Sequence, residues 1–217
     1  AMLAAVNERT RVIFIANPNN PTGTWVPGAD LINFLQQLPS TVWVVLDEAY
    51  LEYMTADDYI DGVALLKKFP NLILTRTFSK VYGLAAVRLG YGVSSPEFAD
   101  LLNRVRQPFN VNALAMAAAI TAIADEEYVR ESVEMNRQGM LQMVAGLTGM
   151  GYSYIPSAGN FVSFDAGEPG PEVFQRLLQQ GVIVRPIAEY GLPNHIRVSI
   201  GLPSENERFL TALAKIR

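Results

Sequence analysis

The sequence reads TRTFSKVYGLAAVR over residues 75–88, and this stretch is more informative than any other. It places Lys80 directly after a predicted strand and among apolar and aromatic side chains, where an amine can act as a nucleophile toward a carbonyl. Ser79 and Arg88 add a hydroxyl and a guanidinium, the groups that a phosphate monoester requires. On this segment alone, an ordinary solvated lysine is an open alternative. A Ser–Lys protease dyad is disfavoured, because adjacent residues of an extended backbone point to opposite sides.

Apolar runs before and after this stretch predict a mostly parallel sheet flanked by helices. Residues 12–15 and 42–46 are apolar without polar alternation, which is typical of strands buried on both faces. A helix is predicted between them, because apolar residues recur there at helical spacing. A second strand, helix and strand step leads through residues 64–69 to 72–74, and a further run follows at residues 89–93. We therefore expect an α/β sheet of at least four strands.

The second half of the chain is first helical and then mixed. Helical spacing predicts helices at residues 97–105, 113–124 and 126–148, and the last is long enough to bridge two domains. The rest reads as a smaller α+β unit, with strands at 161–164, 182–184 and 196–200 and helices at 171–180 and from Ser204, whose spacing to Glu207 suits a capping box. We expect two domains, residues 1–144 and 145–217.

Composition excludes several classes of function. The chain has 217 residues, 50% hydrophobic and 18% charged, with a formal net charge of −4 and no run of five like charges. Nucleic acid and anionic membrane surfaces are therefore poor partners. With no cysteine and one histidine, disulfides, thiolate metal sites and multi-histidine zinc sites are excluded. No run reaches the ~18 apolar residues of a membrane helix, and we expect a cytoplasmic protein without a metal site.

Polar residues follow the predicted strand at residues 42–46. Asp47 and Tyr50 belong to the DEAY sequence that comes directly after it, and open α/β sheets place ligands beyond the carboxyl ends of their strands. An aspartate carried into an apolar crevice needs a cationic partner, and a protonated ring nitrogen would be one. The alternative is an aspartate that caps the N-terminus of a helix.

A proline-rich loop follows the first predicted strand. Residues 17–23 read NPNNPTG, and the two prolines and the glycine fix a non-helical backbone. Asn20 can project its side-chain amide from this rigid loop. Taken alone, the motif is equally a structural turn.

Two arginines near the end of the chain call for an anion. Arg197 lies in the predicted strand IRVSIG, and Arg185 follows the apolar residues 182–184. A substrate carboxylate is a suitable partner for an arginine in such surroundings, and a structural ion pair with a glutamate is the alternative for each. Tyr190, in the loop between them, is a candidate for the substrate pocket.

The order of these motifs resembles the fold type I aminotransferases, which have the aspartate-aminotransferase-like fold. NPNNPTG is followed by DEAY, then by TFSK with an arginine eight residues on, and then by RVSIG. Within that superfamily the chain is most similar to the histidinol-phosphate aminotransferases, through DEAYLEY, TFSKVYGLAAVRLGY and GVIVRP ahead of IRVSIG. The resemblance extends from Arg11 to the end of the chain. It implies pyridoxal 5′-phosphate as the cofactor, a large cofactor-binding domain and a small C-terminal domain.

The resemblance also implies roles for residues near the cofactor ring. Lys80 would hold the cofactor covalently and move a proton between the substrate α-carbon and the cofactor. Asp47 would pair with the ring nitrogen and keep it protonated, so that the ring can accept electrons. Asn20 and Tyr50 would hydrogen-bond the phenolic oxygen of the ring.

Further roles concern the anionic groups of cofactor and substrates. Ser79 and Arg88 would hold the cofactor phosphate. Arg197, helped by Arg185 and with Tyr190 lining the pocket, would bind the phosphate of histidinol phosphate and the carboxylate of glutamate. The implied reaction converts histidinol phosphate and 2-oxoglutarate to imidazole-acetol phosphate and glutamate, in histidine biosynthesis.

The resemblance implies a longer protein as well. Family members carry a substantial stretch ahead of the position of Ala1, with further strands, part of the phosphate cradle and an aromatic residue that stacks on the ring. Residues 1–10 read as the end of a helix that runs into a strand. We therefore expect an N-terminally incomplete chain, weak or no cofactor binding by this polypeptide alone, and a homodimer in the complete protein.

Three alternatives stay open at this stage. Another fold type I enzyme, such as an aromatic amino-acid aminotransferase or a threonine-phosphate decarboxylase, would use the same cofactor residues. A catalytically silent, ligand-sensing module would need an attached DNA-binding segment, and the sequence shows nothing basic of that kind. A structural α/β domain would bind no cofactor at all.

Overall fold

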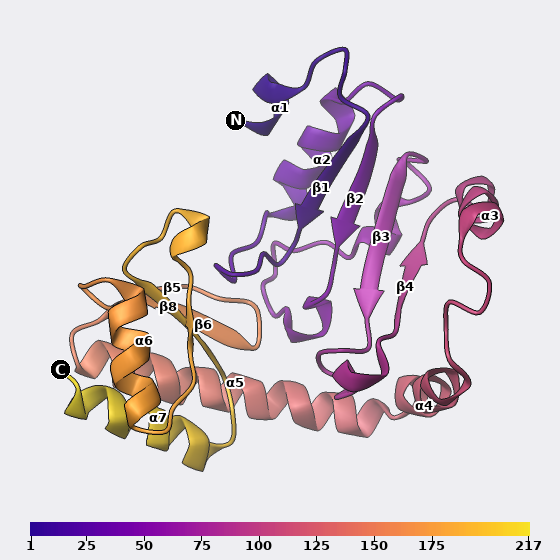
Figure 1. Cartoon of the computed structure of the whole chain (residues 1–217). Helices are drawn as coiled ribbons and strands as arrows, with labels where there is room; N and C mark the ends of the chain where they lie inside the picture. Colours follow the sequence, from indigo (N-terminus) through magenta and orange to yellow (C-terminus); the bar gives the residue numbers. More distant parts are fainter. The chain divides into compact units, whose positions relative to one another are not determined.

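The computed structural model describes all 217 residues and divides into two compact units (Figure 1). The N-terminal unit comprises residues 1–18 and 25–129, and the C-terminal unit comprises residues 19–24 and 130–217. The helix α5, Glu126–Gly149, carries the chain from one unit to the other. The predicted boundary between residues 144 and 145 falls within this helix, and the domain division stays a prediction.

The N-terminal unit contains a four-stranded sheet in the order β1-β2-β3-β4. Its first three strands run parallel, and β4 is antiparallel to β3. The mostly parallel α/β sheet predicted from the apolar runs is thereby confirmed. Because β1, β2 and β3 share one direction, their carboxyl ends meet at one edge of the sheet. The strands are β1 (Val12–Ala16), β2 (Trp43–Asp47), β3 (Leu72–Thr77) and β4 (Gly90–Val93).

One α-helix and two short 3-10 helices lie in the connections between the parallel strands. The helix α2, Gly28–Gln37, joins β1 to β2 and buries Leu31 and Leu35 against the sheet. Between β2 and β3 the chain forms two short 3-10 helices, η1 (Leu51–Tyr53) and η2 (Gly62–Leu65), where a full helical step was expected. The second of these, η2, lies in the stretch of the expected helix. Its Leu65 is buried in the same apolar core, so one short turn supplies the contact that a longer helix would make.

Two further helices of the N-terminal unit begin at side-chain caps. The helix α3, Pro96–Val105, starts at Ser95, whose hydroxyl accepts a hydrogen bond from the Phe98 N–H. The helix α4, Ala113–Ala124, starts at Asn112, and the short α1 covers Met2–Ala5. No helix of the chain combines the length and apolar character needed to cross a membrane.

The C-terminal unit contains an antiparallel sheet in the order β5-β6-β8-β7. The predicted strand at residues 182–184 is wrong, because pairing with β8 begins only at Arg185. The Val182 N–H still bonds back to the Leu177 carbonyl, across Gly181 in a left-handed conformation, so this segment completes the end of a helix. The strands are β5 (Ser153–Ile155), β6 (Phe161–Asp165), β7 (Arg185–Pro186) and β8 (His195–Ser199).

Three helices share one apolar core with this sheet. They are α5, α6 (Gly170–Gln179) and α7 (Pro203–Lys215). The buried side chains they contribute around Phe164 are Met143, Leu147, Val173, Leu177, Phe209, Ala212 and Leu213. The predicted capping box at Ser204 and Glu207 is wrong: the Leu202 N–H donates to the Glu205 carboxylate at 2.8 Å. The shift arises because Pro203 occupies the first helical position, which places the cap one residue before it.

Two adjacent leucines of α6 test this packing. Leu177 is fully buried, whereas Leu178 is 41% exposed. We expect Leu177→Ala to lower the free energy of unfolding by about 2–5 kcal/mol, because it removes buried methyl groups and leaves a cavity. Leu178→Ala makes the same change in helix propensity as Leu177→Ala, and it should lower the free energy of unfolding by less than about 1 kcal/mol. Urea unfolding of both variants measures the difference, and equal losses would contradict this description of the core.

Candidate active site

Asp47 and Thr75 mark the edge where the parallel strands end. The two residues are partners in the register of β2 and β3, and the Thr75 hydroxyl donates to Asp47 Oδ1 at 3.1 Å. Asp47 is exposed, which corrects the expectation of an apolar crevice, because it is the last residue of β2 and lies beyond the core. It caps no helix either, since the following 3-10 helix η1, Leu51–Tyr53, begins after Tyr50.

Lys80 faces the ring of Tyr50 in the same unit. The Lys80 Nζ atom lies 5.2 Å from the centroid of that ring, a cation–π distance. Tyr50 is buried and Lys80 is half-buried, so the amine lies at the surface of an aromatic wall. The flanking side chains of Phe78 and Val81 are buried and anchor the segment. The lysine singled out by the sequence is therefore held by the core on both sides of the chain.

The turn around Lys80 is closed by backbone hydrogen bonds. The Leu84 N–H donates to the Phe78 carbonyl at 3.0 Å, and the Gly83 N–H donates to the Lys80 carbonyl at 2.9 Å. Gly83 has φ +68°, a left-handed conformation that glycine adopts without strain. These bonds give Lys80 a defined backbone from which to project its amine.

Ser79 and Arg88 lie together, as the sequence predicts for a phosphate site. Arg88 Nη1 donates to the Ser79 hydroxyl at 3.4 Å and to the Ala85 carbonyl at 2.9 Å. Arg88 follows the 3-10 helix η3, Ala85–Val87, and its φ of 57° is unusual for a residue with a side chain. Such backbone strain occurs preferentially at functional sites. A hydroxyl and a guanidinium in contact form a donor set suited to a phosphate.

A buried ionic network lies next to Asp47 in the chain. Glu48 is fully buried and accepts hydrogen bonds from the Gly62 N–H at 2.8 Å, from the Tyr59 hydroxyl at 3.3 Å and from Arg76 Nε at 2.9 Å. Arg76 also contacts Asp61 at 2.6 Å. Burial raises the pKa of Glu48, while the Gly62 N–H and Arg76 oppose the rise. The sequence motifs contain both residues, but the sequence-based assignment gave neither a role.

The loop that carries Asn20 belongs to the C-terminal unit. The buried Ser163 hydroxyl donates to the Pro21 carbonyl at 2.6 Å, and the Ala158 N–H donates to the Gly23 carbonyl at 2.8 Å. A Cβ atom at Gly23 would lie 2.0 Å from Ser157 Oγ, so only glycine fits there. Asn20 is exposed at the tip of this fixed loop.

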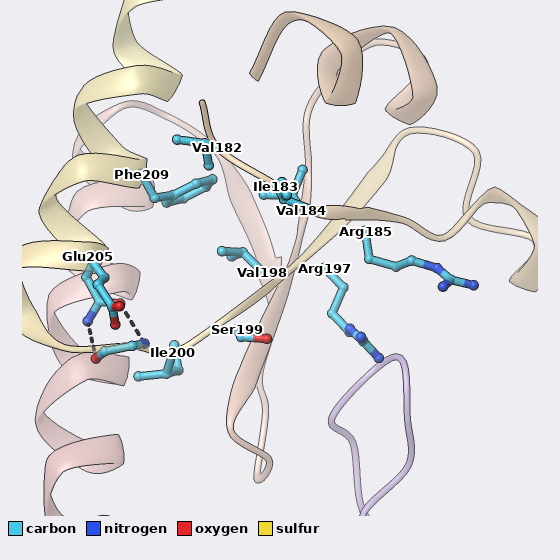
Figure 2. Close-up of a pocket in the computed structure, with 12 residues that line it drawn as sticks. Val182, Ile183, Val184, Arg185, Arg197, Val198, Ser199, Ile200, Glu205 and Phe209 are labelled. Carbon is cyan, nitrogen blue, oxygen red and sulfur yellow. Dashed lines mark hydrogen bonds between the residues drawn. The ribbon is translucent and has the colours of Figure 1, made fainter. Parts of the chain in front are cut away.

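Arg197 and Arg185 lie opposite each other on neighbouring strands of the C-terminal unit (Figure 2). Arg197 Nη1 donates to Asn20 Oδ1 at 2.5 Å, and its guanidinium lies 5.1 Å from the centroid of the Phe161 ring. Its Nε is buried and has no hydrogen-bond partner. Like charges directly opposite on paired strands are unfavourable, so this arrangement favours a bound anion. Arg185 forms the ion pair left open by the sequence, with Glu189 at 3.0 Å.

The structure thus groups the predicted site residues into two sets, each described within its own unit. Tyr190 ends the 3-10 helix η4, Ala188–Tyr190, and is more than half exposed. The N-terminal unit holds Asp47, Tyr50, Ser79, Lys80 and Arg88, and the C-terminal unit holds Asn20, Arg185, Tyr190 and Arg197.

Comparison with known proteins agrees with the fold and with these motifs. The family model described as aminotransferase class I and II matches residues 1–213, and the chain belongs to this family of aminotransferases. Among curated relatives, histidinol-phosphate aminotransferase 2 of Pseudomonas fluorescens (strain Pf0-1) is 60% identical over 216 residues. That alignment covers 100% of this chain and 58% of the relative, so the chain spans little more than half of that protein.

Solved structures show the same similarity. The histidinol-phosphate aminotransferase of Sinorhizobium meliloti, in complex with pyridoxal-5'-phosphate, superposes with a TM-score of 0.91 at 35% identity, over 99% of this chain and 60% of that one. The L-threonine-O-3-phosphate decarboxylase of Porphyromonas gingivalis has a TM-score of 0.83 at 24% identity, over 96% of this chain and 65% of that one. The second likeness concerns the fold alone. The predicted aspartate-aminotransferase-like fold is confirmed by these structures.

Glu48 gives a testable pH dependence of stability. Its folded pKa lies above the ordinary value of 4.5, so above that pH the unfolded chain loses the proton first. The folded state then binds more protons, and this contribution to stability falls as the pH rises through the folded pKa. We expect the free energy of unfolding of the wild type to fall relative to Glu48→Gln as the pH rises from 4.5 toward neutrality.

Urea unfolding at a series of pH values measures this difference. Glu134→Gln is the control, because Glu134 forms an exposed pair with Arg137 that solvent screens. A wild type that gains stability relative to Glu48→Gln over the same pH range would contradict the direction given for Glu48.

Proposed function

We propose that this chain is part of an enzyme that uses pyridoxal 5′-phosphate to transfer an amino group between an amino donor and a 2-oxo acid. One observation carries the proposal: an amine, a carboxylate and a hydroxyl–guanidinium pair project from one unit near the carboxyl ends of parallel strands. These are Lys80, Asp47 and the pair Ser79–Arg88. Membership of the aminotransferase family supports this choice of chemistry.

The residues present fit the functional groups of this cofactor. Its aldehyde needs an amine, its ring nitrogen needs an anion, and its phosphate needs hydrogen-bond donors with positive charge. Lys80 supplies the first, Asp47 the second, and Ser79 with Arg88 the third. When bound, the cofactor supplies an electron sink for the negative charge that develops at the substrate α-carbon.

Lys80 has two tasks in this proposal. Its Nζ would hold the cofactor, and the same amine would accept and return a proton at the substrate α-carbon. The Tyr50 ring beside it keeps one side of the amine away from water. Asp47 would accept a hydrogen bond from the ring nitrogen, while the Thr75 hydroxyl donates to its Oδ1 atom.

Asn20 and Arg197 form a hydrogen-bonded pair within the C-terminal unit. The Asn20 amide oxygen already accepts from Arg197, which leaves Nδ2 as the donor that the phenolic oxygen of the ring would need. Tyr50 is the second residue expected to hydrogen-bond the phenolic oxygen, through its hydroxyl. Both assignments stay predictions of the resemblance.

We propose histidinol phosphate and 2-oxoglutarate as the substrates, giving imidazole-acetol phosphate and glutamate. Both molecules carry anionic groups, and Arg185 and Arg197, which are paired on neighbouring strands, would bind them, with Tyr190 lining the pocket. The histidinol-phosphate aminotransferase relatives at 50–60% identity support this substrate over others. A homodimer and a cytoplasmic location stay predictions.

Replacement of Lys80 tests the cofactor assignment. In the intact protein we expect Lys80→Ala to lose at least about 10²-fold in turnover, because it removes both the covalent anchor and the proton carrier. The exposed Lys67→Ala, on the same unit, is the control and should keep wild-type activity. Borohydride treatment with pyridoxal phosphate, followed by peptide mass analysis, should label Lys80 in the wild type. Labelling of a different lysine, with Lys80 unmodified, would overturn the assignment.

Amino donors distinguish the candidate activities. We expect the intact protein to prefer histidinol phosphate over phenylalanine and over threonine phosphate, as judged by kcat/KM with 2-oxoglutarate as acceptor. Preference for phenylalanine would indicate an aromatic amino-acid aminotransferase. Release of carbon dioxide from threonine phosphate would indicate a decarboxylase, the activity named for the Porphyromonas gingivalis protein of similar fold.

A further inference from the structure

Two pairs of side chains leave opposite faces of the sheet where β2 and β3 end. Asp47 contacts Thr75 on one face, and the residues that follow them in the chain, Glu48 and Arg76, contact each other on the opposite face. The alternation follows from the two-residue period of an extended backbone. Only the first pair belongs to the proposed cofactor site, so the second pair has no assigned role.

Several hydrogen bonds and ion pairs hold the Glu48 and Arg76 side chains in place. Glu48 is fully buried, and its two oxygens accept from the Gly62 N–H, the Tyr59 hydroxyl and Arg76. Arg76 is held by Glu48 at 2.8 Å and by Asp61 at 2.6 Å. A buried charge tolerates little movement, because displacement leaves it without partners in a medium of low polarity.

Backbone hydrogen bonds tie this element to the two residues that face the cofactor. The Glu48 N–H donates to the Thr75 carbonyl at 2.9 Å, and the Leu51 N–H donates to the Glu48 carbonyl at 3.1 Å. The Asp47 carbonyl accepts from the Asn17 N–H at 2.9 Å. Glu48 is thus bonded through its backbone to the Thr75 residue that contacts Asp47 and to Leu51, the residue after Tyr50.

The network also fixes the position of a positive charge. Arg76 adjoins Thr75 in sequence, and a free guanidinium there could turn toward the Asp47 carboxylate. Its contacts with Glu48 and Asp61 hold it on the opposite face. Asp47 then keeps its charge for a cationic ring nitrogen.

We propose that the buried Glu48–Arg76 pair is a positioning element that orients Asp47 toward the ring nitrogen and keeps the Arg76 guanidinium away from it. The inference rests on the proposed function. It concerns residues that would not touch the cofactor. If the pair only stabilised the fold, its removal would weaken the binding of both ligands alike. If it positions Asp47, its removal should weaken specifically the contact with the ring nitrogen.

The test compares two ligands in the intact protein. One is pyridoxal 5′-phosphate, and the other is its deaza analogue, in which a C–H group replaces the ring nitrogen. The ratio of their dissociation constants isolates the contact between that nitrogen and Asp47. In the wild type we expect the natural cofactor to bind roughly 10- to 100-fold more tightly, as a hydrogen bond to a charged group would give.

Three variants are measured with both ligands. Glu48→Gln keeps the shape but removes the charge. The double variant Glu48→Gln/Arg76→Met removes both charges, so no unpaired guanidinium is left in the protein interior. It provides the measurement if the single variant does not fold. Val173→Ala, in the core of the C-terminal unit, lowers stability without touching the network.

We expect the ratio to fall about fivefold or more in the Glu48 variants and to keep its wild-type value in Val173→Ala. An unchanged ratio in both Glu48 variants would overturn the positioning role while leaving the proposed function intact. A wild type that binds both ligands equally, or neither, would overturn the proposed function and the inference with it.

Discussion

The parallel alignment of β1, β2 and β3 is the constraint on which the proposed site depends. Parallel strands place their carboxyl ends at one edge, and there Asp47 lies in register with Thr75. The chain beyond β3 then turns back through hydrogen-bonded loops, which present Lys80 against the Tyr50 ring. The apolar runs that form the strands therefore also bring a carboxylate, a hydroxyl and an amine into one unit.

Charge is separated across the same strands. The sheet directs Asp47 to one face and Glu48 to the other, and the partners of each differ in kind. Glu48 has a cation and buried donors, as a carboxylate in a core requires, whereas the exposed Asp47 has one neutral hydroxyl. A buried ion pair gives little net stability, because desolvation offsets the Coulomb attraction. The pair beside the proposed site therefore fits a role in positioning Asp47 better than a role in stability.

Much of the fold could be predicted from sequence, because its strands are apolar runs and its helices repeat apolar residues at helical spacing, as in α2 and α5. The grouping of Ser79 with Arg88 was also predicted, because both lie in one short segment. The strand at residues 182–184 was not correct, since its apolar residues finish a helix. The Glu48–Arg76 contact depends on strand register, which no local pattern specifies.

The protonation of the cofactor's ring nitrogen tests the central claim most directly. It can be measured from the NMR chemical shift of isotope-labelled nitrogen in pyridoxal phosphate bound to the intact protein. We expect the shift of a protonated pyridinium in the wild type at neutral pH, and loss of that signal in Asp47→Ala. A neutral pyridine shift in the wild type, or a protonated shift that persists in Asp47→Ala, would contradict it.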